Sequence, residues 1–120
     1  MSESNYLSKN HMTAIEEVAF VLYLKKGNEV EYQRRHDEIW PELSATLLEA
    51  GVLNYQIFLE PNTGHLFAYQ KRRSDHTLDQ LPGLPIMRKW WDYMADIMEV
   101  NADNSPVVQT LDRVFKLASE

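Results

Sequence analysis

The chain has 120 residues, of which 44% are hydrophobic and 25% charged, and its formal net charge is −6 at pH 7. This composition is ordinary for one globular domain, and the negative charge disfavours a general nucleic-acid binder, which needs clustered Lys and Arg. The chain has no cysteine, so disulfides, thiolate nucleophiles and thiolate metal sites are excluded.

No apolar run approaches the roughly 20 residues of a membrane span, and the polar N-terminus lacks the apolar stretch of a signal peptide. We therefore expect a cytoplasmic protein without a membrane partner. Residues 1–14 show no clear periodicity, and we expect a mobile extension there, before a single domain of residues 15–120. The short basic runs at residues 34–35, 71–73 and 88–89 have acidic neighbours, which indicates solvated faces and no nucleic-acid partner.

Apolar residues fill both alternating sets of residues 18–24, which predicts a central strand covered on both faces. From Glu29 the period becomes helical and continues to about Ala50, where Gly51 supplies a stop. Pro41 interrupts this helix, because it disfavours the helical conformation of Trp40 and removes a backbone donor.

Alternation at Leu53, Tyr55, Ile57 and Leu59 predicts a second strand, with Tyr55 pointing inward. The turn residues 60–64 then predict a hairpin to a third strand at about residues 65–71. Two adjacent apolar lines predict a helix from about Pro85 to Met98. A final strand is expected within residues 107–117, centred on Val114 and Phe115.

This order of strand, helix, strand, strand, helix and strand predicts an α+β, ferredoxin-like βαββαβ fold with an antiparallel sheet. Both helices then cover the same face of the sheet. Because the first strand is apolar on both faces, something must cover the other face as well. A second copy of the chain is the simplest cover, so we expect a homodimer.

Tyr32 and His36 lie four residues apart and share one helical face, at the edge of the apolar stripe that includes Ile39 and Leu43. A phenol and an imidazole over an apolar surface suggest a site for a small polar ligand, because imidazole exchanges protons near neutral pH. The alternative is a surface histidine or a hydrogen-bonded core histidine.

Trp90 and Trp91 are adjacent, so on a helix their side chains diverge by about 100°. Both can belong to the broad apolar core face. Alternatively, an indole face suits the C–H face of a pyranose, with tyrosine, histidine and asparagine available for its hydroxyls. The four histidines are scattered without metal-ligand spacing, so we expect no metal. No glycine-rich phosphate loop occurs and no serine lies in a nucleophile elbow, which disfavours a nucleotide enzyme or a serine hydrolase.

Five segments resemble, in order, the motifs of the L-rhamnose mutarotases. They are Tyr32-Gln-Arg-Arg-His36 with Ile39-Trp-Pro-Glu-Leu43, then Gly51-Val-Leu-Asn-Tyr-Gln-Ile-Phe-Leu59, Leu66-Phe-Ala68, Trp90-Trp-Asp-Tyr-Met94 and Asp103-Asn-Ser-Pro106. The resemblance runs from about residue 17 to 117 and is looser between Lys71 and Leu84.

This resemblance implies a dimeric α+β barrel that interconverts the α and β anomers of L-rhamnopyranose without a cofactor, in rhamnose catabolism. It makes His36 the proton donor and Tyr32, Tyr55, Trp90 and Trp91 the sugar-binding residues. The second proton carrier is left open between Tyr32, a carboxylate and water. Alternatives are a small monooxygenase or haem-binding protein of the same barrel, or a non-catalytic sugar-binding protein.

Overall fold

A computed structural model describes residues 14–119, and its elements follow the predicted order. They are strand β1 (Ile15–Tyr23), helices α2 (Glu29–Asp37) and α3 (Pro41–Ala50), strands β2 (Val52–Glu60) and β3 (His65–Arg73), the 3-10 helix η1 (Leu78–Gly83), helix α4 (Pro85–Met94) and strand β4 (Gln109–Leu111). The expected N-terminal extension lies outside the described residues, except for Ala14.

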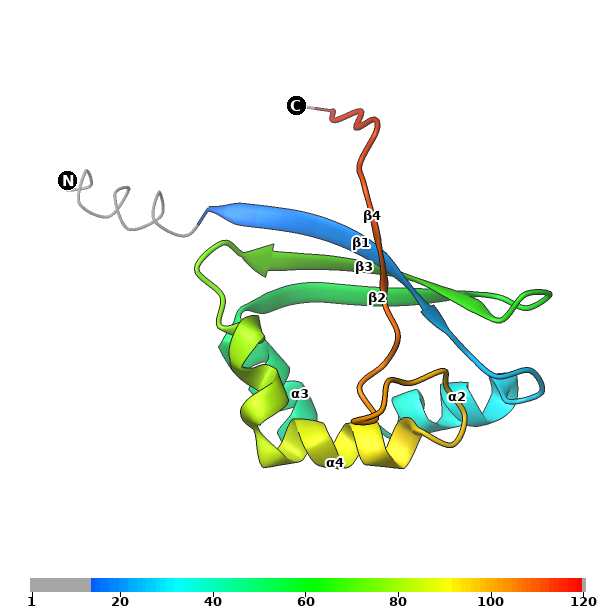
Figure 1. The fold of residues 1–120 in the computed structure, drawn as a ribbon. Helices are drawn as coiled ribbons and strands as arrows, with labels where there is room; N and C mark the ends of the chain where they lie inside the picture. Colours follow the sequence, from blue (N-terminus) through cyan, green and yellow to red (C-terminus); the bar gives the residue numbers. More distant parts are fainter. Residues whose placement is uncertain (1–13, 120) are drawn as a thin grey trace, which may run out of the picture.

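The four strands form one antiparallel sheet in the order β2-β3-β1-β4. Helices α2, α3 and α4 all lie on the same face of this sheet (Figure 1). The predicted α+β, ferredoxin-like fold is confirmed. Leu22 of β1 and Leu24 just after the strand belong to the core on the helix side, so Val21 and Tyr23, the residues next to Leu22, lie on the opposite, outer face.

The predicted break at Pro41 separates α2 from α3. Trp40, the residue before the proline, has an extended backbone with φ −62° and ψ 128°, because Pro disfavours the helical conformation of its predecessor. Pro41 then occupies the first position of α3, where a missing N–H costs no intrahelical bond. Gly51 ends α3 with φ 119°, a left-handed conformation that favours glycine.

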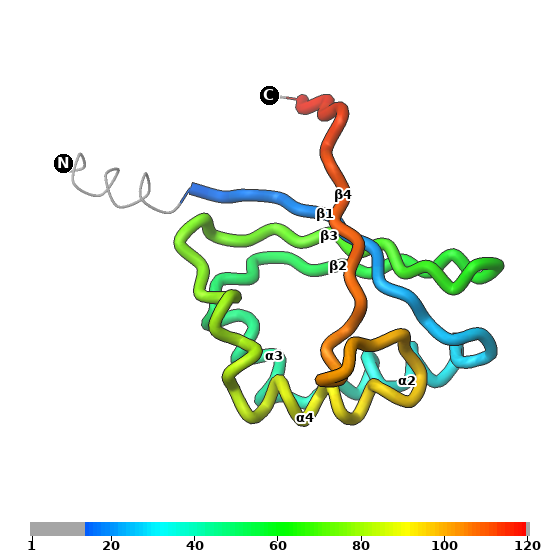
Figure 2. Tube along the Cα trace, viewed as in Figure 1, coloured from blue at the N-terminus to red at the C-terminus, as the bar shows by residue number. Residues whose placement is uncertain are grey.

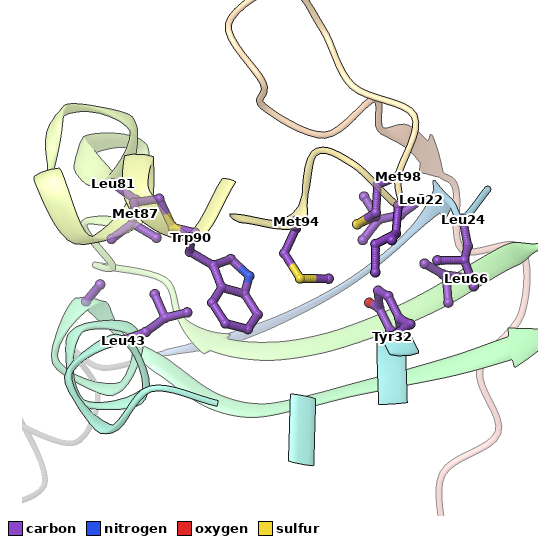
Figure 3. Packing of buried hydrophobic residues seen from close by; sticks show 12 residues of the cluster. Leu22, Leu24, Tyr32, Leu43, Leu66, Leu81, Met87, Trp90, Met94 and Met98 are labelled. Carbon is purple, nitrogen blue, oxygen red and sulfur yellow. The ribbon is translucent and has the colours of Figure 1, made fainter. Parts of the chain in front are cut away.

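The hydrophobic core lies between the sheet and the helices. Leu43 of α3 and Leu66 of β3 are each 1% exposed, and burying a side chain of this size contributes about 1.5–3 kcal/mol. Helix α4 contributes Met87, Trp90 and Met94. Figure 3 shows Tyr32 and Trp90 among the leucine and methionine side chains of this core.

The helix expected to reach Met98 ends at Met94. The backbone of Met98 instead forms an isolated antiparallel bridge with Leu24, and the Ile97 carbonyl accepts a hydrogen bond from Lys25 N at 2.8 Å. Ile97 and Met98 are still buried, at 3% and 5% exposed. The apolar period therefore continued beyond the point where the backbone leaves the helix.

The last strand is shorter than expected and is not centred on Val114 and Phe115. Strand β4 pairs with β1 only from Gln109 to Leu111, and Val114 and Phe115 beyond it are 93% and 76% exposed. Figure 2 shows the chain continuing past the sheet, away from the helices, after β4. This segment is tied to β1 through Glu17, whose carboxylate accepts hydrogen bonds from Arg113 and Lys116 at 2.9 and 3.1 Å.

Candidate active site

An open cavity of about 1170 Å³ is bounded by the helices and by the helix-facing side of the sheet. All five site residues named from the sequence line it: Tyr32, His36, Tyr55, Trp90 and Trp91. They come from α2, β2 and α4. The i, i+4 spacing brings the two α2 residues to one side, and alternation in β2 puts Tyr55 on the same side as the core residue Ile57.

Tyr32 and His36 form a stacked pair within α2. Their ring centroids are 4.2 Å apart at an interplanar angle of 27°. The Nδ1 atom of His36 lies 3.1 Å from the backbone carbonyl oxygen of Tyr32. Because a carbonyl oxygen only accepts, this contact requires the hydrogen on Nδ1, so the lone pair of the neutral ring lies on Nε2.

Burial lowers the pKa of His36, opposed by the hydrogen bond to the Tyr32 carbonyl and by the charge of Asp37. The edge-on ring of Trp90, with centroids 5.5 Å apart, covers His36 from the side of α4. His36 is therefore mainly neutral at pH 7, and its Nε2 can accept a proton.

The two phenols facing the cavity are held in the protonated form. Burial raises the pKa of Tyr32, and the neighbouring Tyr55 adds to this. Desolvation raises the pKa of Tyr55 to about 12, although 37% of this residue is exposed, because its ring borders the open cavity. Neither hydroxyl has a hydrogen-bond partner among the described residues. Both suit the role of donor to a ligand, and Tyr32 is a poor proton acceptor.

The two tryptophans of α4 have different surroundings. Trp90 is 7% exposed and packs edge-on against Trp40, with ring centroids 5.0 Å apart, as well as against His36. Trp91 is half-buried, and the guanidinium of Arg88 lies 5.6 Å from its ring centroid. Trp90 is thus mainly a core residue that supports His36, whereas Trp91 offers a face to the cavity.

Arg35 was expected on a solvated face, and this prediction is wrong. The residue is 8% exposed and donates to both carboxylate oxygens of Asp96 at 2.9 and 3.2 Å, and to the Tyr93 carbonyl at 2.7 Å. Its Nε also donates to Glu31 at 2.7 Å. Arg35 therefore links α2, the helix that carries His36, to the C-terminal end of α4. Its neighbour Arg34 is exposed, as expected.

Sequence reasoning missed two polar residues of β3 that line the cavity, Gln70 and Arg72. Both continue, two residues apart, the series of Leu66 and Ala68, which are buried at 1% and 2% exposed. That alternation was the available signal, since residues two apart in a strand share a face. Among residues 14–119, no group of three or more His, Asp and Glu side chains could hold a metal ion. No helix in the same part of the chain is long and apolar enough to cross a membrane.

Comparison with known proteins finds similar proteins over nearly the whole chain. The family model described as L-rhamnose mutarotase matches residues 17–117. The L-rhamnose mutarotase of Paraburkholderia phytofirmans is 53% identical over 105 residues, covering 88% of this chain and 98% of that protein. The one from Agrobacterium fabrum is 54% identical over 106 residues, with 88% and 99% covered.

A crystal structure of an L-rhamnose mutarotase from Formosa agariphila superposes with a TM-score of 0.79 at 47% identity. The match covers 86% of this chain and 99% of that one. Fold and sequence agree over the matched residues. The chain belongs to the L-rhamnose mutarotase family, a family of anomer-interconverting isomerases.

Proposed function

We propose that this protein interconverts the α and β anomers of L-rhamnopyranose, without a cofactor, by opening and closing the sugar ring. One observation carries the proposal. A neutral imidazole, two protonated phenols and an indole face line a single cavity in a chain that matches the L-rhamnose mutarotase family from residue 17 to 117. Such a cavity, largely apolar with a few polar groups, suits a small polar ligand.

His36 is the proposed proton carrier. Ring opening breaks the C1–O5 bond, moves a proton from O1 to O5 and leaves a C1=O1 carbonyl. Because Nδ1–H is engaged by the Tyr32 carbonyl, Nε2 is the free acceptor of the neutral ring. In our proposal Nε2 takes the proton of the anomeric hydroxyl and then, as part of an imidazolium, donates it to O5.

One nitrogen suffices for both transfers, since O1 and O5 are bonded to the same carbon. Rotation about C1–C2 presents the other carbonyl face, and the same movements in reverse give the opposite anomer. His36 thus remains the proton donor to the ring oxygen and also serves as the second proton carrier. This removes the need for Tyr32 as a base, which its raised pKa disfavours.

The other site residues are proposed to bind the sugar. The hydroxyls of Tyr32 and Tyr55 donate hydrogen bonds to sugar oxygens, and Trp91 stacks on the C–H face of the pyranose. Trp90 contacts the site mainly through His36, whose ring it covers.

Saturation-transfer NMR between α- and β-L-rhamnose tests the function directly. We expect the wild-type protein to accelerate exchange and His36→Ala to lose about 10²- to 10⁴-fold of the rate. The matched control is His65→Ala, because His65 stacks edge-on against Tyr23, centroids 5.2 Å apart, on the outer sheet face. That variant should keep the rate. Rhamnose binding without faster exchange would favour a sugar-binding protein, and a Soret band after haem reconstitution would favour the haem-binding class.

We also propose that the protein is a homodimer whose sheets face each other. Phe58, Phe67 and Leu111 on the outer face are 60%, 42% and 42% exposed, and Phe58 and Phe67 are register partners on neighbouring strands. No helix of residues 14–119 covers this face (Figure 1). Light scattering after size exclusion should give twice the chain mass, and Phe58→Asp should shift it toward the monomer. A wild-type monomer at micromolar concentration contradicts this proposal.

The proposed setting is rhamnose catabolism in the cytoplasm. Anomer exchange is useful where one anomer enters a cell and a later enzyme consumes the other. Fractionation of cells grown on L-rhamnose should find the protein with the cytoplasmic enzymes, and growth on limiting rhamnose should slow when the protein is removed.

A further inference from the structure

Gln70 is a buried polar residue that lines the cavity, and the proposed mechanism assigns it no role. It is 6% exposed and lines the cavity. Its register partners are Tyr55 on β2 and Val18 on β1, so its side chain lies beside that of Tyr55 on the helix-facing side. A buried primary amide needs hydrogen-bond partners for both its oxygen and its nitrogen.

The orientation of this amide is fixed by Arg72. The Arg72 Nη1 atom donates to Gln70 Oε1 at 3.2 Å. A guanidinium can only donate, so the amide oxygen faces Arg72 and the NH2 group faces the other way. Arg72 is itself held by Glu16, with Nε to Oε1 at 2.8 Å. His76 Nε2 lies 3.4 Å from the same carboxylate oxygen.

The NH2 group of Gln70 has no acceptor among the described residues. Every fully buried side-chain nitrogen or oxygen in that part of the chain does have a partner. The Nε2 atom is therefore not fully buried, and the cavity that Gln70 lines is the space onto which it opens. With its oxygen turned to Arg72, the amide leaves two N–H donors for a ligand in the cavity that Gln70 and Tyr55 both line.

We infer that Gln70 is a sugar-positioning residue whose Nε2 donates a hydrogen bond to a ring hydroxyl oxygen of the bound pyranose, with Arg72 setting the direction of the amide. The inference rests on the proposed function, since it concerns the substrate of the same cavity. It assigns specificity to the sheet side of the site, opposite His36 and Tyr32 on α2. A sugar that lacks the contacted hydroxyl leaves the amide unpaired, so it binds less well.

The direct test is Gln70→Met, which keeps the length of the side chain and removes the donors. Titration of tryptophan fluorescence with L-rhamnose should show about a tenfold rise in Kd, the expected effect of one lost hydrogen bond in a buried site. KM for anomer exchange should rise by a similar factor, with a smaller change in kcat. Gln80→Met is the matched control, because Gln80 is exposed in η1 and does not line the cavity; it should change neither value.

A deoxy-sugar series separates a contact from a general disturbance. Wild type and Gln70→Met are titrated with L-rhamnose and with its 2-, 3- and 4-deoxy forms. If Gln70 contacts a hydroxyl, the variant makes no further difference for the sugar that lacks it. Equal weakening for all four sugars, or no weakening for L-rhamnose, overturns the inference. Where Gln70→Met does not fold, Arg72→Met serves, because it leaves the amide unoriented and should show the same sugar-dependent loss.

Failure of the proposed function gives a different result. If the wild type binds L-rhamnose without accelerating exchange, the mutarotase proposal is wrong, and the deoxy series still decides the role of Gln70 from binding alone. If the wild type binds none of these sugars, both proposals are overturned.

Discussion

The protonation state of His36 predicts how kcat/KM for anomer exchange depends on pH. Burial places the His36 pKa below its ordinary value of 6.5, so at pH 7 more than about three quarters of the imidazole is neutral. In the proposed route the neutral ring must first accept the anomeric proton. We therefore expect kcat/KM to be constant near neutrality and to fall as the pH drops through the His36 pKa. One pH unit below that pKa about a tenth of the ring is neutral, so the rate should fall about tenfold.

The assay is saturation-transfer NMR across the pH range, with the rate for His36→Ala subtracted because sugars also mutarotate in water. Titration of the His36 Cε1–H resonance shows whether the kinetic and spectroscopic pKa values agree. A depressed histidine pKa also makes the fold less stable as the pH falls through that pKa, so circular dichroism must confirm that the protein is folded at each point. A kcat/KM that rises toward acid pH would refute this reasoning, because the imidazolium would then be the form that starts the reaction.

Three further predictions concern the frame of the site. In a urea titration, Arg35→Met should lower the free energy of unfolding by about 2 kcal/mol, since it removes buried hydrogen bonds to charged and carbonyl partners. Arg34→Met, at an exposed position, is the control and should change this free energy by less than about 0.5 kcal/mol. Gly51→Ala should lower the free energy of unfolding by about 2–3 kcal/mol or prevent folding, because φ is +119° there and the new Cβ would lie 2.7 Å from the His76 Cβ. Gly27→Ala, at φ +89°, meets no atom within 4 Å and should lower it less. Trp91→Ala should raise Kd for L-rhamnose by a larger factor than it lowers kcat, and an unchanged fluorescence titration would exclude Trp91 as the stacking surface.

The sequence predicted those parts of the fold that depend on local chemistry. The break between α2 and α3 follows from Pro41 alone, because the proline restricts its predecessor whatever lies around it. The inward direction of Tyr55 follows from strand alternation, and the shared face of Tyr32 and His36 follows from helical spacing. Once the order of elements was known, few sheet topologies remained.

The sequence could not predict features that depend on distant partners. Helical spacing puts Arg35, three residues after Tyr32, on the buried stripe, but its partner Asp96 is 61 residues away, so nothing local shows that a charge at this position would be paired. The orientation of the Gln70 amide depends on Arg72 and on Glu16 across the sheet. The end of α4 was missed for a related reason. Ile97 and Met98 are buried without being helical, and periodicity detects burial, not backbone geometry.

The adjacent tryptophans show how one helix connects the core to the chemistry. Because neighbouring helical residues diverge by about 100°, Trp90 and Trp91 cannot perform the same task. Trp90 packs against both Trp40 and His36, so it connects the residue just before α3 to the imidazole near the end of α2. A substitution of Trp90 therefore disturbs the direction of His36 as well as the core, and a loss of rate in such a variant does not indicate contact with the sugar. Trp91 lies at the cavity without those contacts, and it is the tryptophan at which sugar binding can be measured separately from folding.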